Sequence, residues 1–184
     1  MNLLPQTYLL GLVGLLAIVA VVVGRQFLRV RRDEARLIEL EKSDTASSRQ
    51  ASDLYELGSV QLRKRLYPQA AATLKQALKR LSGEPDEARA LIENALGFAL
   101  AAQKDYSGAT KHYKLALKAK ADYPVALNNL AFAQEKLLKD AEAISLYEKT
   151  LQLEPDNATA KKRLKKPSRP LMERGTLFLA TGFA

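Results

Sequence analysis

The stretch that decides the fold occurs twice: Asn94-Ala-Leu-Gly-Phe-Ala-Leu100 returns 34 residues later as Asn128-Asn-Leu-Ala-Phe-Ala-Gln134. The segments that follow match at the same offset, since Ala109-x3-Tyr113 corresponds to Ala143-x3-Tyr147. A fainter copy begins near Tyr55. Repetition at such a period predicts stacked supersecondary units, each of which buries its apolar face only against its neighbours.

Each unit is expected to be two antiparallel helices, A and B. In the first unit Leu54, Leu57 and Gly58 lie on one face of helix A at helical spacing. Small residues at Gly58 and Ala70 allow A and B to approach closely. The expected A and B helices are residues 51–63 and 67–81, then 87–103 and 106–119, then 124–137 and 140–153, in units of about 51–83, 87–120 and 124–155.

A short helix is expected to close the stack. Pro155 ends the third unit because proline cannot continue a helix. Asp156 is the expected N-cap of a helix over residues 158–165, which would cover the apolar side of the last unit. The predicted fold class is therefore all-α: an α-solenoid of three helix pairs with a C-terminal capping helix over residues 51–166, and a disordered tail over residues 167–184.

The pattern resembles the tetratricopeptide repeat family, in its Leu57-Gly58 and Leu96-Gly97 pairs, its 34-residue period and Pro155. It departs from the family where Glu93 takes the place of a large aromatic residue and Ala131 that of a glycine. The resemblance implies a solenoid that binds proteins in a groove lined by the A helices.

Six residues of the A helices are expected to face this groove, three positions before and one after each glycine position. An Asn can pair with peptide amides, and a Phe offers an apolar surface. Alternatively, both Phe residues pack between neighbouring units. A clamp for a carboxylate is not expected, because the nearest cations are Arg63 and Lys136, near the ends of helices A. The six candidates are Tyr55, Ser59, Asn94, Phe98, Asn128 and Phe132.

The N-terminal segment predicts a transmembrane helix. No charged side chain occurs over residues 1–24, and about 20 apolar residues are needed to cross the hydrocarbon core. A cleaved signal peptide is disfavoured because no Lys or Arg precedes Arg25, and a core helix because the segment is apolar all round. A charged helical connector and hinge, residues 25–50, would follow the anchor. The positive-inside rule predicts a translocated N-terminus and a body on the cytoplasmic or stromal side, since four arginines follow the span: Arg25, Arg29, Arg31 and Arg32.

The composition argues against an enzymatic function and against a metal site. The chain has no Cys and one His, which excludes disulfides, thiolate catalysis and multi-histidine metal sites. His112 is expected to be a surface residue, and no nucleophile is paired with a base. We therefore expect a non-enzyme with no cofactor, no metal and no small-molecule substrate. The net charge of +9 lies mainly outside the repeats, since residues 51–160 contribute only +1 and residues 161–184 contribute +6; no specific nucleic acid is expected.

A closer resemblance combines the anchor, the Arg31-Arg-Asp-Glu-Ala-Arg36 connector and phrases such as Tyr123-Pro-Val-Ala-Leu-Asn-Asn-Leu130. Together they resemble membrane-anchored tetratricopeptide proteins of cyanobacteria and plastids that act in photosystem I assembly or stability. That resemblance implies a thylakoid location, with photosystem I subunits or assembly factors as partners. Two alternatives stay open: an anchored receptor for targeting or secretion peptides, and a protein whose basic tail, beginning at residues 161–166, binds RNA or anionic lipid.

Overall fold

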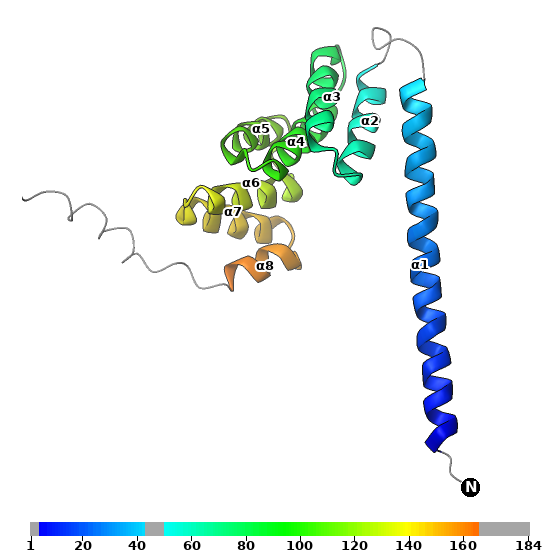
Figure 1. The fold of residues 1–184 in the computed structure, drawn as a ribbon. Helices are drawn as coiled ribbons and strands as arrows, with labels where there is room; N and C mark the ends of the chain where they lie inside the picture. The colour runs from blue at the N-terminus through cyan, green and yellow to red at the C-terminus, as the bar shows by residue number, and fades with distance from the viewer. Residues whose placement is uncertain (1–3, 43–49, 166–184) are drawn as a thin grey trace, which may run out of the picture.

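A computed structural model of the chain describes residues 4–42 and 50–165. This part consists of eight α-helices and contains no strand (Figure 1). The all-α prediction is confirmed, and every expected repeat helix is present with its ends within two residues. The helices are α1 (Leu4–Lys42), α2 (Ala51–Arg63), α3 (Tyr67–Arg80), α4 (Asp86–Ala102), α5 (Tyr106–Ala119), α6 (Pro124–Lys136), α7 (Asp140–Leu153) and α8 (Ala158–Leu164).

The seven helices after α1 form a solenoid of three pairs and a cap. Helices α2 and α3, α4 and α5, and α6 and α7 pack as antiparallel pairs, and each pair packs on the next. Helix α2 also contacts α4, and α4 contacts α6. The A helices are therefore the ones that meet across the unit boundaries, so they line the inner side of the stack.

Close approach of A and B depends on a small residue of helix A facing a large residue of helix B. In the first unit a Cβ added to Gly58 would lie 2.8 Å from Cγ of Leu74, which is fully buried. In the third unit Ala131 packs in one buried cluster with Tyr147. The small-to-large pairing inferred from the sequence thus sets the spacing within each pair.

The turn from A to B has the same geometry in all three units. One residue takes a positive φ: Arg65 (61°), Lys104 (68°) or Leu138 (61°). The next backbone N–H then reaches back to a carbonyl in the last turn of helix A, as in a Schellman motif. These bonds are Leu66 N to Gln61 O (2.8 Å), Asp105 N to Leu100 O (3.0 Å) and Lys139 N to Gln134 O (2.9 Å).

The N-cap of α8 differs from the prediction. Asn157, not Asp156, is the capping residue, because the helix begins at Ala158 and the Asn157 Oδ1 accepts from the backbone N–H of Ala160 (3.0 Å). Asp156 instead accepts from Nζ of Lys161 (2.9 Å). Ala160 is buried in the cluster that contains Ala131 and Tyr147, so α8 covers the end of the core as expected of a cap.

Helix α1 is long and projects beyond the solenoid (Figure 1). Its Tyr8–Arg29 segment has a mean hydropathy of 2.3 and none of it is buried, so by length and composition it could cross a membrane and it is not a core helix. The following part of α1 packs on α2, and Glu34 pairs with Lys64 at 3.5 Å. The expected hinge lies almost wholly outside the described residues, as does the tail of residues 167–184.

Candidate protein-binding face

The six predicted residues lie on three A helices that adjoin one another. Tyr55 and Ser59 belong to α2, Asn94 and Phe98 to α4, and the remaining two, Asn128 and Phe132, to α6. We call these six residues the inner face.

Asn94 is tied to the third unit by two hydrogen bonds. Its Nδ2 donates to the hydroxyl of Tyr123 (3.3 Å), and its Oδ1 accepts from Nδ2 of Asn129 (3.0 Å). Burial raises the pKa of Tyr123, repulsion from the ionised form of Tyr55 raises it further, and the hydrogen bond from Asn94 partly offsets the rise. Asn94 thus links the second unit to the third, in addition to lying on the inner face.

Asn128 has one amide atom paired and one unpaired. Its Nδ2 donates to Oδ1 of Asn157 (3.0 Å), the residue that caps α8. Its Oδ1 is buried and has no hydrogen-bond partner within residues 4–42 and 50–165. Buried acceptors are almost always satisfied, so this oxygen is an exception within the described residues.

The two inner-face Phe residues differ. Phe98 is 45% exposed. Phe132 is half-buried: its ring meets Tyr106 edge to face, with centroids 6.3 Å apart, while Arg163 and Lys136 lie 4.9 and 5.3 Å from its centroid. Phe132 therefore joins α8 to α6, as the packing alternative expects, and Phe98 keeps an open apolar surface.

The α2 end of the inner face has fewer groups free to bind a partner than its sequence suggests. The Ser59 hydroxyl donates to the backbone carbonyl of Tyr55 (2.8 Å), so its proton is already committed within the helix. Tyr55 is half-buried and packs against the core of the first two units.

Two inner-face residues were missed from the sequence. Leu91 is 42% exposed and Val125 is 52% exposed, each one turn before the Asn of its helix. They extend the apolar surface of Phe98 along α4 and α6. The signal was present, because Leu91-x2-Asn94 and Val125-x2-Asn128 repeat at the same 34-residue offset.

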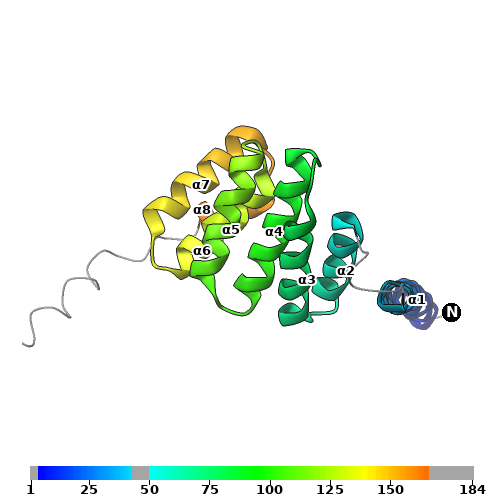
Figure 2. The same cartoon turned by 90° about the horizontal axis from the view of Figure 1, so that it is seen from above.

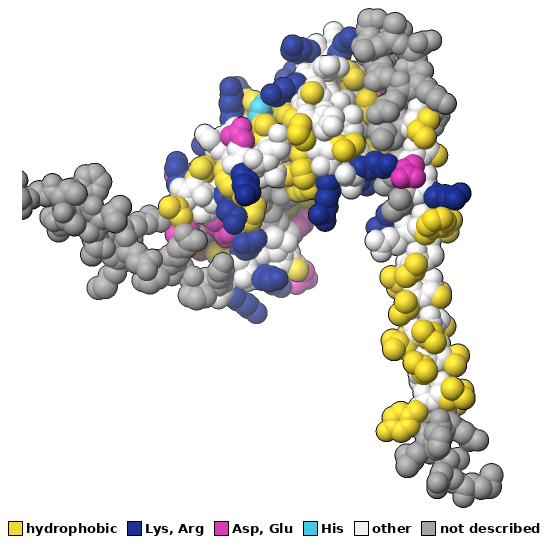
Figure 3. All heavy atoms as spheres, viewed as in Figure 1, with side chains coloured by type: hydrophobic (Ala, Val, Ile, Leu, Met, Phe, Trp, Pro, Cys, Tyr) yellow, Lys and Arg dark blue, Asp and Glu magenta, His cyan; other side chains and the backbone are white. Residues whose placement is uncertain are grey.

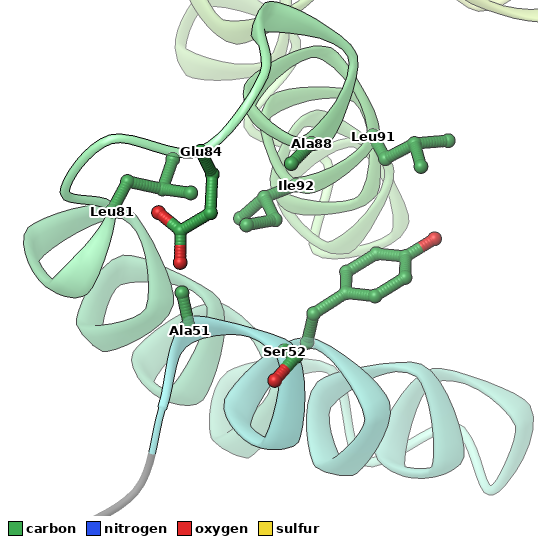
Figure 4. A pocket seen from close by; sticks show the side chains of 8 residues that line it. Ala51, Ser52, Leu81, Glu84, Ala88, Leu91 and Ile92 are labelled. Atoms are coloured by element: carbon green, nitrogen blue, oxygen red, sulfur yellow. The ribbon is translucent and has the colours of Figure 1, made fainter.

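A small apolar pocket adjoins Leu91 at the start of the solenoid (Figure 4). Figure 4 shows Leu81 and Ile92 pointing into it from α4 and the loop before it, with the Glu84 carboxylate at its edge and Leu91 projecting to one side. Its volume of about 170 Å³ suits one apolar side chain, because a cavity of about 150 Å³ holds a benzene ring. The lining residues are Ala51, Ser52, Tyr55, Leu81, Glu84, Ala88, Leu91 and Ile92.

His112 lies away from the inner face and is half-buried, not on the surface as expected. Its Nδ1 is 2.7 Å from Oε2 of Glu93, a side chain that is 5% exposed. The pair joins α4 to α5 on the side of α4 that faces its own helix B. A buried carboxylate with one imidazole partner, remote from the open surface, is a packing contact.

Among known proteins, the chain is similar to tetratricopeptide and ycf37 proteins. It is 33% identical over 157 residues to the tetratricopeptide repeat domain-containing protein PYG7, chloroplastic, of Arabidopsis thaliana, covering 85% of this chain and 52% of that protein. It is 30% identical over 162 residues to the uncharacterized protein ycf37 of Guillardia theta, covering 88% and 91%. The chain thus spans about half the length of PYG7 and nearly all of this ycf37. No protein-family model matches the chain.

Solved structures show the same fold. The first tetratricopeptide domain of Spaghetti (RPAP3), bound to an HSP90 peptide, superposes with a TM-score of 0.58 at 24% identity, over 62% of this chain and 87% of that one. MamA superposes with a TM-score of 0.62 at 22% identity, over 70% and 72%. At these identities the likeness concerns the fold alone.

Proposed function

Because this chain belongs to the family of tetratricopeptide repeat proteins that includes ycf37, a family of protein-interaction scaffolds, we propose that it acts at a membrane as a tethered scaffold. The proposed membrane is the thylakoid, and the proposed role is the assembly or stability of photosystem I. The chloroplastic name of one relative supports a photosynthetic setting. Tetratricopeptide scaffolds are generally non-enzymatic, and the contacts of His112 and Glu93 fit that class.

The observation that carries the proposed binding site is the open part of the inner face. Phe98, Leu91 and Val125 expose apolar surface on adjacent A helices. Apolar side chains of a partner can cover these three. Lys136 borders the same face at Phe132, whereas Arg163 is already paired with Glu135 (3.0 Å), so a partner segment that combines apolar residues with an acidic one fits this face best.

The proposed tether is α1. The Tyr8–Arg29 segment is long enough to span the hydrocarbon core, and Arg29, Arg31 and Arg32 lie at or beyond its end. The positive-inside rule then favours a solenoid on the cytoplasmic or stromal side.

The partner is tested by affinity capture of the full chain from solubilised thylakoids. Wild type is expected to recover photosystem I subunits, and Phe98→Ala/Val125→Ala to recover at least tenfold less. Leu115→Ala is the matched control, because Leu115 is an exposed apolar residue on α5, a B helix. Equal recovery by all three proteins refutes the inner-face site, and recovery of other proteins alone refutes the photosystem assignment.

Topology is tested with a single introduced cysteine, since the chain has none. A membrane-impermeant maleimide added from the cytoplasmic or stromal side is expected to label Ser107→Cys, an exposed residue of α5. Labelling only after the membrane is opened refutes the proposed orientation.

A receptor for targeting or secretion peptides is the second candidate. The row of Leu91, Phe98 and Val125 also suits the apolar side of an amphipathic helix. Saturable binding of an amphipathic presequence peptide, lost in Phe98→Ala/Val125→Ala, favours this candidate.

A further inference from the structure

The solenoid bends so that its last helix, although it lies apart from α1, is lower along the direction of α1 than its first helix. Figure 1 shows α2 beside the C-terminal part of α1, and the later helices descending until α8 is level with the middle of α1. Figure 2, seen from above, places α8 beneath α5 and α6, in agreement. The packing of α1 on α2 and the Glu34–Lys64 pair (3.5 Å) support this placement.

The middle of α1 is also where its apolar character ends. Side chains are uncharged up to Gly24, and Arg25 and Arg29 open the charged part of the helix. If α1 spans a membrane, the headgroups lie at this level, because arginines at the end of a span sit at the interface. The height of α8 along α1 is therefore close to that of a membrane surface.

Helix α8 carries basic residues and no acidic one. Lys161, Lys162, Arg163 and Lys165 occur within residues 158–165. Arg163 is engaged with Glu135 (3.0 Å) and Phe132, and Lys161 pairs with Asp156 (2.9 Å).

Lys162 on α8 and Lys165, the residue directly after the helix, are both exposed. In Figure 3, Lys and Arg side chains gather along the lower edge of the solenoid, on the side toward the apolar half of α1, with a few acidic groups among them. The positive charge along this edge suits contact with an anionic surface.

We propose that α8 docks on anionic lipid headgroups of the membrane that α1 spans, so that the solenoid is held to the membrane at both ends. The inference rests on the proposed membrane tether. Each lysine near an anionic surface strengthens such a contact about fivefold. The tether makes docking intramolecular, so a contact that would be weak in solution becomes populated. Two-point attachment would also fix how the inner face is presented beside the membrane.

The test uses the full chain with Thr159→Cys, an exposed α8 position that becomes its only cysteine. A fluorophore on this cysteine is read in vesicles whose headgroups carry a quencher. Stronger quenching in phosphatidylglycerol vesicles than in phosphatidylcholine vesicles, falling with salt, is the expected result. Lys162→Glu/Lys165→Glu is expected to shift the docking equilibrium at least 25-fold, as two lysines at about fivefold each imply.

The matched control is Lys75→Glu/Lys79→Glu, which reverses two exposed lysines on α3 and is expected to leave quenching unchanged. Equal quenching in both lipids, or equal loss in both double variants, overturns the proposal. The proposal is also overturned if the α8 lysines bind RNA or an acidic protein while the fluorophore at position 159 stays unquenched. Flotation of every variant with neutral vesicles tests the tether separately; absence of flotation refutes the tether and, with it, this inference.

Discussion

Gly97 on α4 lies directly against the ring of Tyr113 on α5. A Cβ at position 97 would stand 2.6 Å from Cε1 of Tyr113, whose side chain is almost wholly buried. This contact repeats the Gly58–Leu74 approach of the first unit at the corresponding positions, whereas the third unit accommodates Ala131. Each helix pair is therefore fitted around its own small and large residues.

Gly97→Ala is expected to destabilise the solenoid. Alanine gains about 1 kcal/mol of helix propensity over glycine, but overpacking a rigid buried ring costs about 1–3 kcal/mol. The cost of the clash should exceed the gain in helix propensity. The full-length Gly97→Ala variant in detergent should therefore have a lower urea midpoint than wild type. Gln76→Ala, at an exposed helical site, is the control. A midpoint at or above that of wild type would show that Tyr113 can move aside.

Lys104→Gly is expected to stabilise the chain by about 1 kcal/mol, because a side chain in the left-handed region costs about that much. Lys104 has a φ of 68° and is exposed. Lys104→Ala separates the backbone effect from loss of the side chain, since alanine keeps the strain. In thermal unfolding, Lys104→Gly should melt at a higher temperature than Lys104→Ala. The reverse order would contradict the strain argument.

Asn157→Ala is expected to cost about 1 kcal/mol, since it removes the N-cap of α8. The same change removes the acceptor of the Asn128 amide (3.0 Å) and so loosens the cap from α6. Amide hydrogen exchange should rise in α8 and in the first half of α6, around Asn128. Asp156→Ala is the comparison, and a larger loss from it would restore Asp156 as the capping residue.

His112→Ala is expected to destabilise the chain by about 1–3 kcal/mol, the cost of leaving a buried polar group unpaired. The Glu93 carboxylate is buried and would lose its 2.7 Å partner. Adding Glu93→Leu should recover part of the loss, because the group needing a partner is then gone. Strictly additive losses in the double-mutant cycle would show that the pair is not coupled.

Stability is expected to fall above about pH 10, the ordinary pKa of tyrosine. Burial raises the pKa of Tyr113 beyond its usual range, so unfolded chains release this proton first and high pH favours them. One such tyrosine contributes up to about 1.4 kcal/mol per pH unit. Tyr113→Phe should flatten the decline in urea midpoint between pH 9 and 11 while changing it little at pH 7. An unchanged slope would show that Tyr113 does not control this loss.

The repeat architecture was predictable because its signals are local and periodic. Small and large residues at fixed offsets, with Pro155 at the end, predicted seven helices after the apolar segment to within two residues. The N-cap of α8 was not predicted, since Asp156 and Asn157 are adjacent candidates and only the start of the helix decides between them.

The inner face was predictable in place but not in detail. Sequence spacing placed Asn94, Phe98, Asn128 and Phe132 on adjacent A helices, but could not show that Arg163 lies 4.9 Å from Phe132 while Phe98 remains open. Stacking brings together Phe132 and Arg163, which are 31 positions apart, and spacing within one helix carries no information about that contact.

The 34-residue repeat of Asn94 and Asn128 by itself determined the class of fold, because each unit can bury its apolar side only against the next. Tertiary structure decided which side chains stay available. Asn94 is paired to Tyr123 and Asn129, and Asn128 donates to the Asn157 that caps α8, whereas Phe98 stays exposed. It also decided where α8 lies along α1, since that height results from the bend of the whole stack and from no local signal.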